Sequence, residues 1–485
     1  MSSIEPVLPR PVPGILSPPF RAMTIGMLAL ISLLAFEQLA VATVMPVVAT
    51  ALGDASLYAA AFGVALAAGI VGMVLAGRWS DRAGPAPALW AGIAAFVLGL
   101  AAAGTAPTMP ALVLGRALQG MGGGLMGVAL YVVVGQHYPS ALHARIFAAF
   151  AAAWVLPAIV GPALAGLMER HFGWRWVFLA AALLALPSAA MVWRGLVAGA
   201  RPAPARPQDV QEPRAGLGPA ALAAVSAGLL YAGGQSAAGH AAVVAAALVG
   251  LALSAPRLLP HGTFTARHGL PAVIGLRGLA AAAFVTAEVF IPLMLTRERG
   301  LTPVQAGLVL TIGALGWSAG SWLQGRSTRP RSDAACVRLL RMGLGSITLG
   351  VAAVTLVLLP AVPLAVAVVG WAITGLGMGL VFPTLSVLML RLAPGAKQGA
   401  ASSALQLSDS LVSAVGLALA GLLLAALQQQ TPTGAFVAGF AVAAGLSALG
   451  LAVAGRARAG RPAVGAATIC DSPESMLDAH QSPPA

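Results

Sequence analysis

The stretch GRWSDRAG, residues 77–84, is a short charged island between two long apolar blocks. The blocks lie near residues 57–77 and 87–106. Each is about 20 residues long, the length of helix that crosses the hydrocarbon core of a bilayer. Glycines at both ends of the island allow a tight turn between the blocks. The stretch therefore predicts the turn of a helical hairpin that lies in a membrane.

The composition of the whole chain agrees with a membrane protein. Of its 485 residues, 59% are hydrophobic and only 8% are charged, whereas ordinary soluble domains carry about 25% charged residues. Backbone groups in hydrocarbon must all be paired internally, which leaves helices or a closed barrel. Barrel strands alternate apolar and polar residues, but these blocks are apolar on all sides. We therefore expect an all-α membrane protein.

Fourteen apolar blocks are candidate transmembrane helices. They lie near residues 23–50, 57–77, 87–106, 110–134, 146–168, 174–194, 217–234, 239–256, 271–295, 303–323, 337–359, 363–390, 399–427 and 434–455.

These blocks predict six parts of the chain. They are a cytoplasmic segment (1–22), a six-helix bundle (23–194), a polar cytoplasmic linker (195–216), two inserted transmembrane helices (217–256), a second six-helix bundle (257–455) and a disordered cytoplasmic tail (456–485).

The distribution of basic residues predicts the orientation. With the N-terminus inside, 22 of the 27 lysines and arginines fall on the cytoplasmic side, among them Arg277; four fall outside, and Arg116 falls within a helix. Such an excess is typical of cytoplasmic loops. It places both termini in the cytoplasm and accounts for the net charge of +13 without nucleic acid. Removing blocks 217–234 and 239–256 together would leave this pattern unchanged, so charge does not test them.

The two predicted bundles are related by an internal repeat. Residues 115–125, GRALQGMGGGL, match residues 370–380, GWAITGLGMGL, at an offset of 255. The same offset aligns residues 161–166 with residues 416–421. Two copies of a six-helix unit with a substrate site between them form a transporter architecture.

The sequence contains no motif of an enzyme. There is no phosphate-binding loop, no metal-ligand cluster and no nucleophile motif. The two cysteines, Cys336 and Cys470, predict neither a disulfide framework nor a metal site. We therefore expect no catalytic residue, no cofactor and no metal.

The island at residues 77–84 resembles the loop motif of the major facilitator superfamily. Gly77, Asp81, Arg82 and Gly84 match the positions of that motif, while the basic pair that usually follows the second glycine is replaced by proline and alanine. The resemblance implies that Asp81 accepts hydrogen bonds from arginines or helix N-termini of the same half and helps to hold an outward-facing state. The alternative is a basic loop that only sets topology.

A second match lies in the block 110–134. Arg116, Gln119 and Gly120 resemble a motif of the proton antiporters of this superfamily, which implies a role for Arg116 in proton transfer. An arginine within the membrane costs at least about 2.5 kcal/mol, so we expect it to face the bundle interior and to have a partner. The alternative is a structural arginine that reaches toward the outer surface, because Arg116 lies close to Pro110.

Residues 157–166, PAIVGPALAG, resemble the antiporter motif GPxxGG with one glycine replaced by alanine. The resemblance implies export rather than uptake. Its prolines and glycines predict a helix that bends and packs closely against a neighbour; the residues concerned are Pro157, Gly161, Pro162 and Gly166. Residues 174–178, WRWVF, resemble the following junction in drug exporters, although an aromatic anchor at the membrane interface would look the same.

Three acidic residues fall within predicted spans: Glu37, Glu288 and Asp409. An acid in the membrane is a candidate functional residue by default. Residues 36–46 around Glu37 resemble the first-helix motif of the fourteen-helix drug:proton antiporters, which implies that Glu37 couples transport to protons. Glu288 is the acid in the first helix of the second half. Each of the three could instead be a structural acid bonded to a neighbouring helix.

Together these features predict a secondary transporter with the major facilitator fold. We expect proton-coupled export of lipophilic or cationic small molecules across a bacterial cytoplasmic membrane by a functional monomer. Uptake or uniport of a small metabolite is the nearest alternative. A membrane-embedded enzyme or a lipid scramblase is the alternative of another class. The expected partners are the substrate, protons and the lipid bilayer, and not nucleic acid.

Overall fold

The computed structural model describes residues 14–54, 57–198, 216–233, 240–326, 331–393, 395–427 and 431–458. Most of the predicted linker and nearly all of the predicted tail therefore lie outside the described residues, as does most of the N-terminal segment. Cys470 lies outside them too.

The described residues form helices joined by short turns, without a strand. The α-helices are α1 (Pro18–Leu52), α2 (Tyr58–Ala83), α3 (Pro85–Gly104), α4 (Met109–His137), α5 (Ser140–Ala152), α6 (Val155–Phe172), α7 (Arg175–Ala198), α8 (Leu217–Gly233), α9 (His240–Leu258), α10 (Leu270–Arg299), α11 (Pro303–Gly325), α12 (Asp333–Leu356), α13 (Ala365–Leu392), α14 (Gln398–Leu427) and α15 (Pro432–Val453).

Local sequence explains where many helices begin and end. Proline occupies one of the first two positions of α1, α3, α4, α10, α11 and α15, where its missing N–H costs nothing. Thr302 and Gln305 form a reciprocal capping box at the start of α11. Gly53 and Gly300 end α1 and α10 in the left-handed conformation, which glycine adopts without strain.

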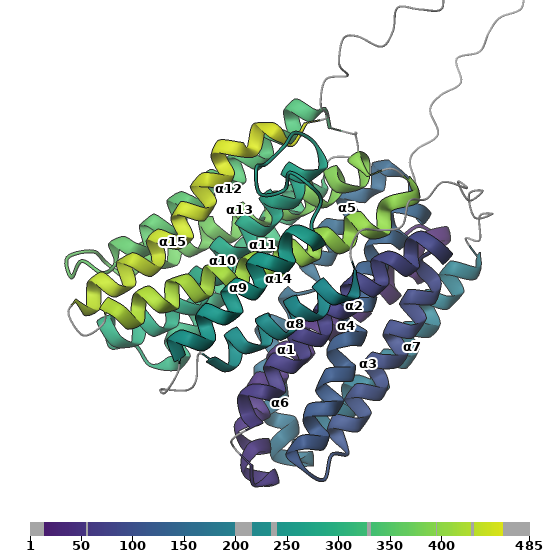
Figure 1. Ribbon diagram of the computed structural model, residues 1–485, viewed down its shortest axis with the longest axis horizontal. Coiled ribbons are helices and arrows are strands. Elements are labelled where there is room, and N and C mark those ends of the chain that lie inside the picture. Colours follow the sequence, from purple (N-terminus) through teal and green to yellow (C-terminus); the bar gives the residue numbers. More distant parts are fainter. Residues whose placement is uncertain are drawn as a thin grey trace, which may run out of the picture.

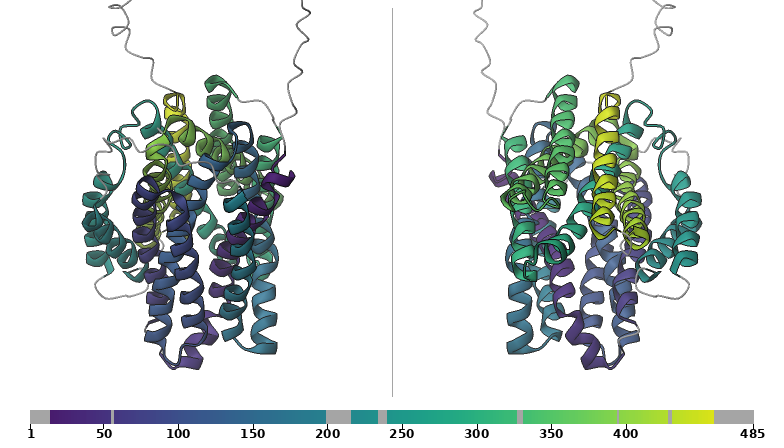
Figure 2. Two further views of the ribbon diagram at one scale, coloured as in Figure 1. Left: turned by 90° about the vertical axis from the view of Figure 1, so that its right-hand side faces the viewer. Right: turned by 90° about the vertical axis from the view of Figure 1, so that its left-hand side faces the viewer.

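The helices form two bundles that meet at one end of the molecule and diverge toward the other (Figure 1). Helices α1–α7 make one half and α10–α15 the other. The halves touch where α2 and α4 pack against α14, and where α5 packs against α11 and α13. Figure 2 shows that both ends of the described chain lie toward this same end. Twelve spans in these halves, with α5 and α6 counted as one, are long and apolar enough to cross a membrane.

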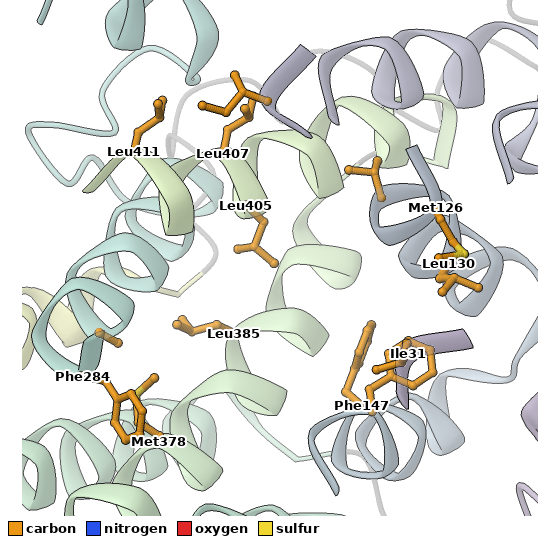
Figure 3. Close-up of a cluster of buried hydrophobic side chains, with 14 of the residues drawn as sticks. Ile31, Met126, Leu130, Phe147, Phe284, Met378, Leu385, Leu405, Leu407 and Leu411 are labelled. Carbon is orange, nitrogen blue, oxygen red and sulfur yellow. The ribbon is translucent and has the colours of Figure 1, made fainter. Parts of the chain in front are cut away.

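Buried apolar side chains line the boundary between the halves. In Figure 3, Ile31, Met126, Leu130 and Phe147 face the boundary from α1, α4 and α5. The other labelled side chains come from α10, α13 and α14 of the second half, and Phe284 among them packs within that half on Trp317 and Trp371. They are Phe284, Met378, Leu385, Leu405, Leu407 and Leu411.

The predicted repeat appears as equivalent helix contacts. Gly120 of α4 packs against the backbone of Ala65 in α2 so closely that a Cβ atom would collide with it. Gly375, 255 residues later in α13, meets the backbone of Gly313 in α11 in the same way. Small residues let helix backbones approach in a membrane, where lipid provides no hydrophobic drive. The repeated glycines therefore fix the same core in both halves.

We expect Gly375→Ala to destabilise the protein by about 1–3 kcal/mol, the usual cost of forcing an atom into a packed core. The matched control is Gly166→Ala, because a Cβ atom at Gly166 would meet nothing within 4 Å. The measurement is the midpoint of thermal unfolding of each purified variant in one detergent. Equal midpoints for the two variants would show that the α11–α13 contact is not tight.

Helices α8 and α9 form the insert between the halves. Helix α8 packs along α2 and α9, and both inserted helices reach α14. Figure 2 shows the pair at one flank of the molecule. Their apolar runs, Leu217–Leu230 and Ala242–Leu258, are shorter than the twelve long spans. The predicted insert is helical, and it bridges the two halves from the side.

Candidate functional site

The N-terminal half contains a buried ion pair between two of its long apolar helices, α1 and α4. Arg116 of α4 donates through Nη1 to a carboxylate oxygen of Glu37 in α1. The same Nη1 donates to Oε1 of Gln119 at 2.7 Å, and Nε donates to the carbonyl of Ala61 in α2 at 3.3 Å. Only 7% of Glu37 and 5% of Arg116 is exposed. Three residues named from the sequence therefore meet at one site, and Arg116 has the partner that was expected of it.

The geometry of this site follows from helix periodicity and close packing. Gln119 lies three residues after Arg116, which places both side chains on the same face of α4. Gly120 brings α4 against α2, and this contact puts the Ala61 carbonyl within reach of the guanidinium. The Nε2 atom of Gln119 is buried and has no hydrogen-bond partner in the part of the chain that the structure describes. The site thus holds one unused donor next to the ion pair.

The second half replaces this ion pair with aromatic rings. Trp371 of α13 stands at the repeat position of Arg116 and stacks on Phe284 of α10, with ring centroids 4.7 Å apart. Trp317 of α11 lies 5.1 Å from Phe284 and 5.0 Å from Phe382. We call Phe284, Trp317, Trp371 and Phe382 the aromatic cluster. Sequence reasoning missed it, although the repeat alignment already set a tryptophan opposite an arginine.

Glu288 lies in α10, one turn beyond Phe284 toward the diverging end. It is half-buried and has no hydrogen-bond or ion-pair partner among the described residues. Trp371, at the repeat position of Arg116, stacks on Phe284, and Glu288 lies one turn beyond Phe284. The two acids expected to be counterparts occupy different surroundings.

Asp409, the third predicted acid, forms a second ion pair. Its Oδ2 accepts a hydrogen bond of 3.1 Å from Nε of Arg277 in α10. The Arg277 guanidinium also lies over the ring of Phe382, 3.3 Å from the centroid. Charge counting had assigned Arg277 to the cytoplasmic loops, and this is wrong because the residue is 4% exposed inside a helix. Arg277 lies six residues after Pro271, just as Arg116 lies six residues after Pro110. This separation was the signal that could have placed Arg277 inside the helix.

Asp81 joins the two halves. Its carboxylate accepts hydrogen bonds from the backbone N–H of Gly399 at 2.6 Å and of Ala400 at 2.9 Å, at the start of α14. The first N–H groups of a helix have no partner within the helix and favour an anion. The sequence predicted a partner within the same half, and this is wrong because α14 belongs to the other half. We call this contact the latch, and the end of the molecule that holds it the latched end.

The glycines of the stretch 77–84 serve the latch and the turn. Gly77 packs directly against Gly399 and Ser403 of α14, so a side chain here would push the halves apart. Gly84 has φ of +80° between α2 and α3. Arg82 has an interaction of its own in the last turn of α2. The stretch 77–84 thus contacts the other bundle as well as forming the turn between α2 and α3.

We expect Asp81→Asn to slow transport several-fold without changing the amount of folded protein. Asparagine keeps the volume, but its amide lacks the charge, and charge at a helix N-terminus contributes about 0.3–1 kcal/mol. The measurement is the initial transport rate at matched expression. Asp333→Asn is the control, because Asp333 pairs with Arg391 inside one half at 3.9 Å. Equal rates in the Asp81 variant and wild type would reduce the latch to a packing contact.

Pro157 divides the predicted span 146–168 into two helices. A proline lacks the N–H that would bond the carbonyl four residues earlier, and its ring clashes with that carbonyl. That carbonyl belongs to Ala153, where α5 ends. It accepts a hydrogen bond of 2.9 Å from Ser32 of α1 instead. The break between α5 and α6 is therefore held to α1 by this hydrogen bond.

The rest of this motif is packed more loosely than expected. A Cβ atom at Gly161 would make only ordinary contacts, 3.6 Å to Phe36 and 3.8 Å to Leu39, and one at Gly166 would meet nothing within 4 Å. Pro162 lies inside α6 without ending it. The predicted close packing is thus absent here in this conformation, and α6 is free of tight backbone contacts at these glycines.

Two helical bundles joined at one end, with twelve long apolar spans among the described residues and buried charges between the helices, define a multi-pass membrane transport protein. The family model described as Major Facilitator Superfamily matches residues 27–406. The chain belongs to this superfamily, and it is a transporter and not an enzyme.

Similar proteins carry names from drug export. A protein of Mycobacterium tuberculosis named "Probable multidrug-efflux transporter" is 27% identical over 414 residues, covering 81% of this chain and 85% of its own. "Multidrug resistance protein 3" of Bacillus subtilis is 28% identical over 158 residues, covering 33% of this chain and 31% of its own.

Solved structures confirm the fold. A human organic anion transporter has a TM-score of 0.63 at 17% identity, covering 90% of this chain and 99% of that one. A bacterial homologue of the iron transporter ferroportin, in an outward-facing state, also gives 0.63, at 14% identity, and covers 89% and 97% of the two chains.

Proposed function

We propose that the protein exports lipophilic or cationic small molecules across the cytoplasmic membrane in exchange for protons. The observation that carries this proposal is the buried pair of Glu37 and Arg116 between two long apolar helices. The names of the similar proteins support export of drug-like compounds.

The ion pair provides a way to couple protons to transport. Glu37 can accept a proton only by giving up its ionic bond to Arg116, because a neutral carboxyl no longer balances the guanidinium. An unbalanced arginine in the membrane is costly and must find another partner or reach water. Protonation of Glu37 would therefore favour a rearrangement of α1 against α4. This provides a proton-dependent step for alternating access.

The latched end is the cytoplasmic end in this proposal. The charge pattern of the loops assigns both termini to the cytoplasm, and both ends of the described chain lie at the latched end (Figure 2). The conformation is then closed toward the cytoplasm and open toward the outside. Release of the latch and closure of the diverging ends would turn the site inward.

This orientation predicts how introduced cysteines react. In a variant without Cys336 and Cys470, a cysteine at Glu298 should react with an impermeant maleimide in intact cells, because it lies in the last turn of α10, which is the outer end of this helix in the proposal. A cysteine at Arg326, which follows the C-terminal end of α11 on the proposed cytoplasmic side, should react only after the membrane is opened. The opposite pattern would invert the topology.

The function is tested with purified protein in proteoliposomes. A pH gradient is imposed, and the accumulation of a panel of neutral and cationic compounds is measured. Uphill accumulation of a compound, driven by protons that move down their gradient in the opposite direction, supports antiport. Equilibration that ignores the gradient would instead indicate a uniport facilitator, and transfer of lipid alone would indicate a scramblase.

A further inference from the structure

A loop of defined shape joins α9 to α10. Residues 259–269 form a series of turns, in which the N–H of Ala266 donates to the carbonyl of Thr263 at 3.1 Å. Gly262 and Gly269 have positive φ values, and Ala266, with φ of +47°, is the one described residue other than glycine that shares this feature. The left-handed conformation is costly for a residue with a Cβ atom. A connection that only carries positive charge for topology would not need such a backbone.

The loop is fastened to the C-terminal end of the described chain. The N–H of Gly269 donates to the carbonyl of Arg456 at 2.9 Å, and Nη1 of Arg456 donates to the carbonyl of Thr265 at 3.0 Å. The guanidinium of Arg341 in α12 lies beside the same segment, because a Cβ atom at Gly455 would be 3.2 Å from its Nη2. Both ends of the described chain lie at the latched end (Figure 2), so the loop lies there too.

Exposed arginines surround the loop without any acidic partner. We call five of them the basic patch: Arg257, Arg267, Arg341, Arg456 and Arg458. None of the five forms an ion pair with an acid in the part of the chain that the structure describes, and Asp333 at the start of α12 pairs with Arg391 instead. The sequence has no acidic residue at positions 257–269 or 454–458. The protein therefore leaves the positive charge of the basic patch uncompensated.

Phe264 projects from the same loop. Its side chain is 64% exposed, whereas Thr263 before it is buried, and the Thr263 carbonyl would lie 3.0 Å from a Cβ atom at Gly275 in α10. The loop thus turns Thr263 toward α10 and Phe264 outward. In segments that lie on a membrane, apolar side chains such as Phe enter the boundary between headgroups and acyl chains, while basic residues face anionic headgroups. An exposed ring beside five arginines fits a membrane surface, whereas a soluble polyanion would need the arginines alone.

We propose that the basic patch and Phe264 form a docking surface for anionic phospholipid headgroups of the cytoplasmic leaflet. A guanidinium can donate two hydrogen bonds to one phosphate, and the negative surface potential of this leaflet attracts basic residues within about 10 Å. Phe264 holds the loop at the depth where these contacts form. Because the loop connects the insert to the second half, bound lipid fixes both to the membrane surface. The proposal rests on the proposed function only for the choice of leaflet, and it adds a lipid partner.

The experiment compares the thermal stability of the full-length protein in two kinds of lipid nanodisc. One contains phosphatidylcholine alone, and the other contains phosphatidylcholine and phosphatidylglycerol in equal amounts. The readout is the difference between the two unfolding midpoints, because a lipid that binds the folded protein raises its midpoint. The variants are Arg257→Gln/Arg267→Gln, the charge-preserving Arg257→Lys/Arg267→Lys, Phe264→Ser and Phe264→Trp. The matched control is Arg21→Gln/Arg194→Gln, which removes two exposed arginines from the same end of the first half.

Wild type should unfold about 2–4 °C higher in the discs with phosphatidylglycerol. Arg257→Gln/Arg267→Gln should lose most of this difference, and Arg257→Lys/Arg267→Lys should keep most of it, because lysine retains the charge. Phe264→Ser should lose part of the difference and Phe264→Trp should keep it, since tryptophan also lies at membrane interfaces. The control should match wild type. The midpoint in pure phosphatidylcholine shows separately whether each variant is folded.

Equal midpoints of wild type in the two discs would overturn the proposal. So would an equal loss in Arg21→Gln/Arg194→Gln, because any exposed arginines would then have the same effect. Polyglutamate added to the phosphatidylcholine discs tests a soluble partner. If polyglutamate raises the wild-type midpoint as much as phosphatidylglycerol does, and Phe264→Ser changes nothing, the occupant is an acidic protein and the lipid proposal is wrong.

These outcomes are separate from those of the proposed function. Both leaflets of a disc contain the same lipid, so the midpoints depend neither on the orientation of the protein nor on transport. Loss of proton-driven accumulation in proteoliposomes would remove antiport and leave the lipid results intact. An inverted maleimide pattern would move the docking surface to the other leaflet and contradict the cytoplasmic assignment.

Discussion

Glu37→Gln is expected to abolish uphill, pH-driven export while the variant reaches the membrane in normal amount. Glutamine keeps the size of the side chain and can still accept a hydrogen bond from Arg116, but it cannot ionise. Glu37 and Arg116 are both buried, so no water molecule or surface charge replaces the lost carboxylate. The step in which a proton displaces Arg116 then no longer exists. Downhill exchange, which needs no proton, can continue.

The measurement is substrate accumulation in everted vesicles with and without a proton gradient. Glu37→Asp is the conservative control, since it restores an ionisable group with a shorter reach. Glu37→Gln combined with Arg116→Gln keeps the test open if the single variant folds poorly, because it removes the unbalanced charge as well. A Glu37→Gln variant that pumps like wild type would move the coupling role to Glu288 or Asp409.

The sequence was sufficient for the fold because long apolar blocks have few ways to satisfy their backbone groups. The blocks located the helices, and the glycines of the repeat located the contacts that hold each half together. Pro157 marked a site where the helix could break, since it cannot bond the carbonyl of Ala153, although Pro162 lies inside α6 without ending it. Only the span prediction, which treated these residues as one uninterrupted block, failed to use it.

The candidate site was predictable where one helix carried the signal by itself. Glu37 and Arg116 stand out as charges in apolar surroundings, and each needs a partner. The partner of Asp81 was not predictable in this way. Gly399 and Ala400 lie 318 and 319 residues away, they bond through backbone N–H groups, and the contact belongs to one conformation of the two halves. No local pattern records such a contact.

Arg277 shows a different limit of sequence reasoning. Counting basic residues assigns each one to a side of the membrane, and an arginine near the cytoplasmic end of a span is absorbed into that count. In the structure Arg277 lies between Asp409 and Phe382 and contacts both, which makes a second polar site. Among the described residues each half thus contains a buried arginine that pairs with an acid, although the repeat aligns neither pair. The two pairs arose at different places in the same six-helix plan.

The second large effect is expected at this pair. Removal of one partner from a buried ion pair typically costs about 3–5 kcal/mol, because the remaining charge is left without compensation. The side chain of Arg277 is 5% exposed and that of Asp409 is 27% exposed, so Asp409 can reach water more easily than Arg277. We therefore expect Asp409→Leu to destabilise the protein more than Arg277→Met.

The double variant Arg277→Met/Asp409→Leu should recover most of the lost stability, because it removes both charges and fills the space with apolar groups. The measurement is a double-mutant cycle on the midpoint of thermal unfolding in detergent, which isolates the interaction between the two side chains. Arg297→Met, in the last turn of α10, is the control for loss of an arginine from the same helix. Additive effects of the two single variants would mean that Arg277 and Asp409 do not depend on each other, and Arg277 would then be held by Phe382 and Ser386.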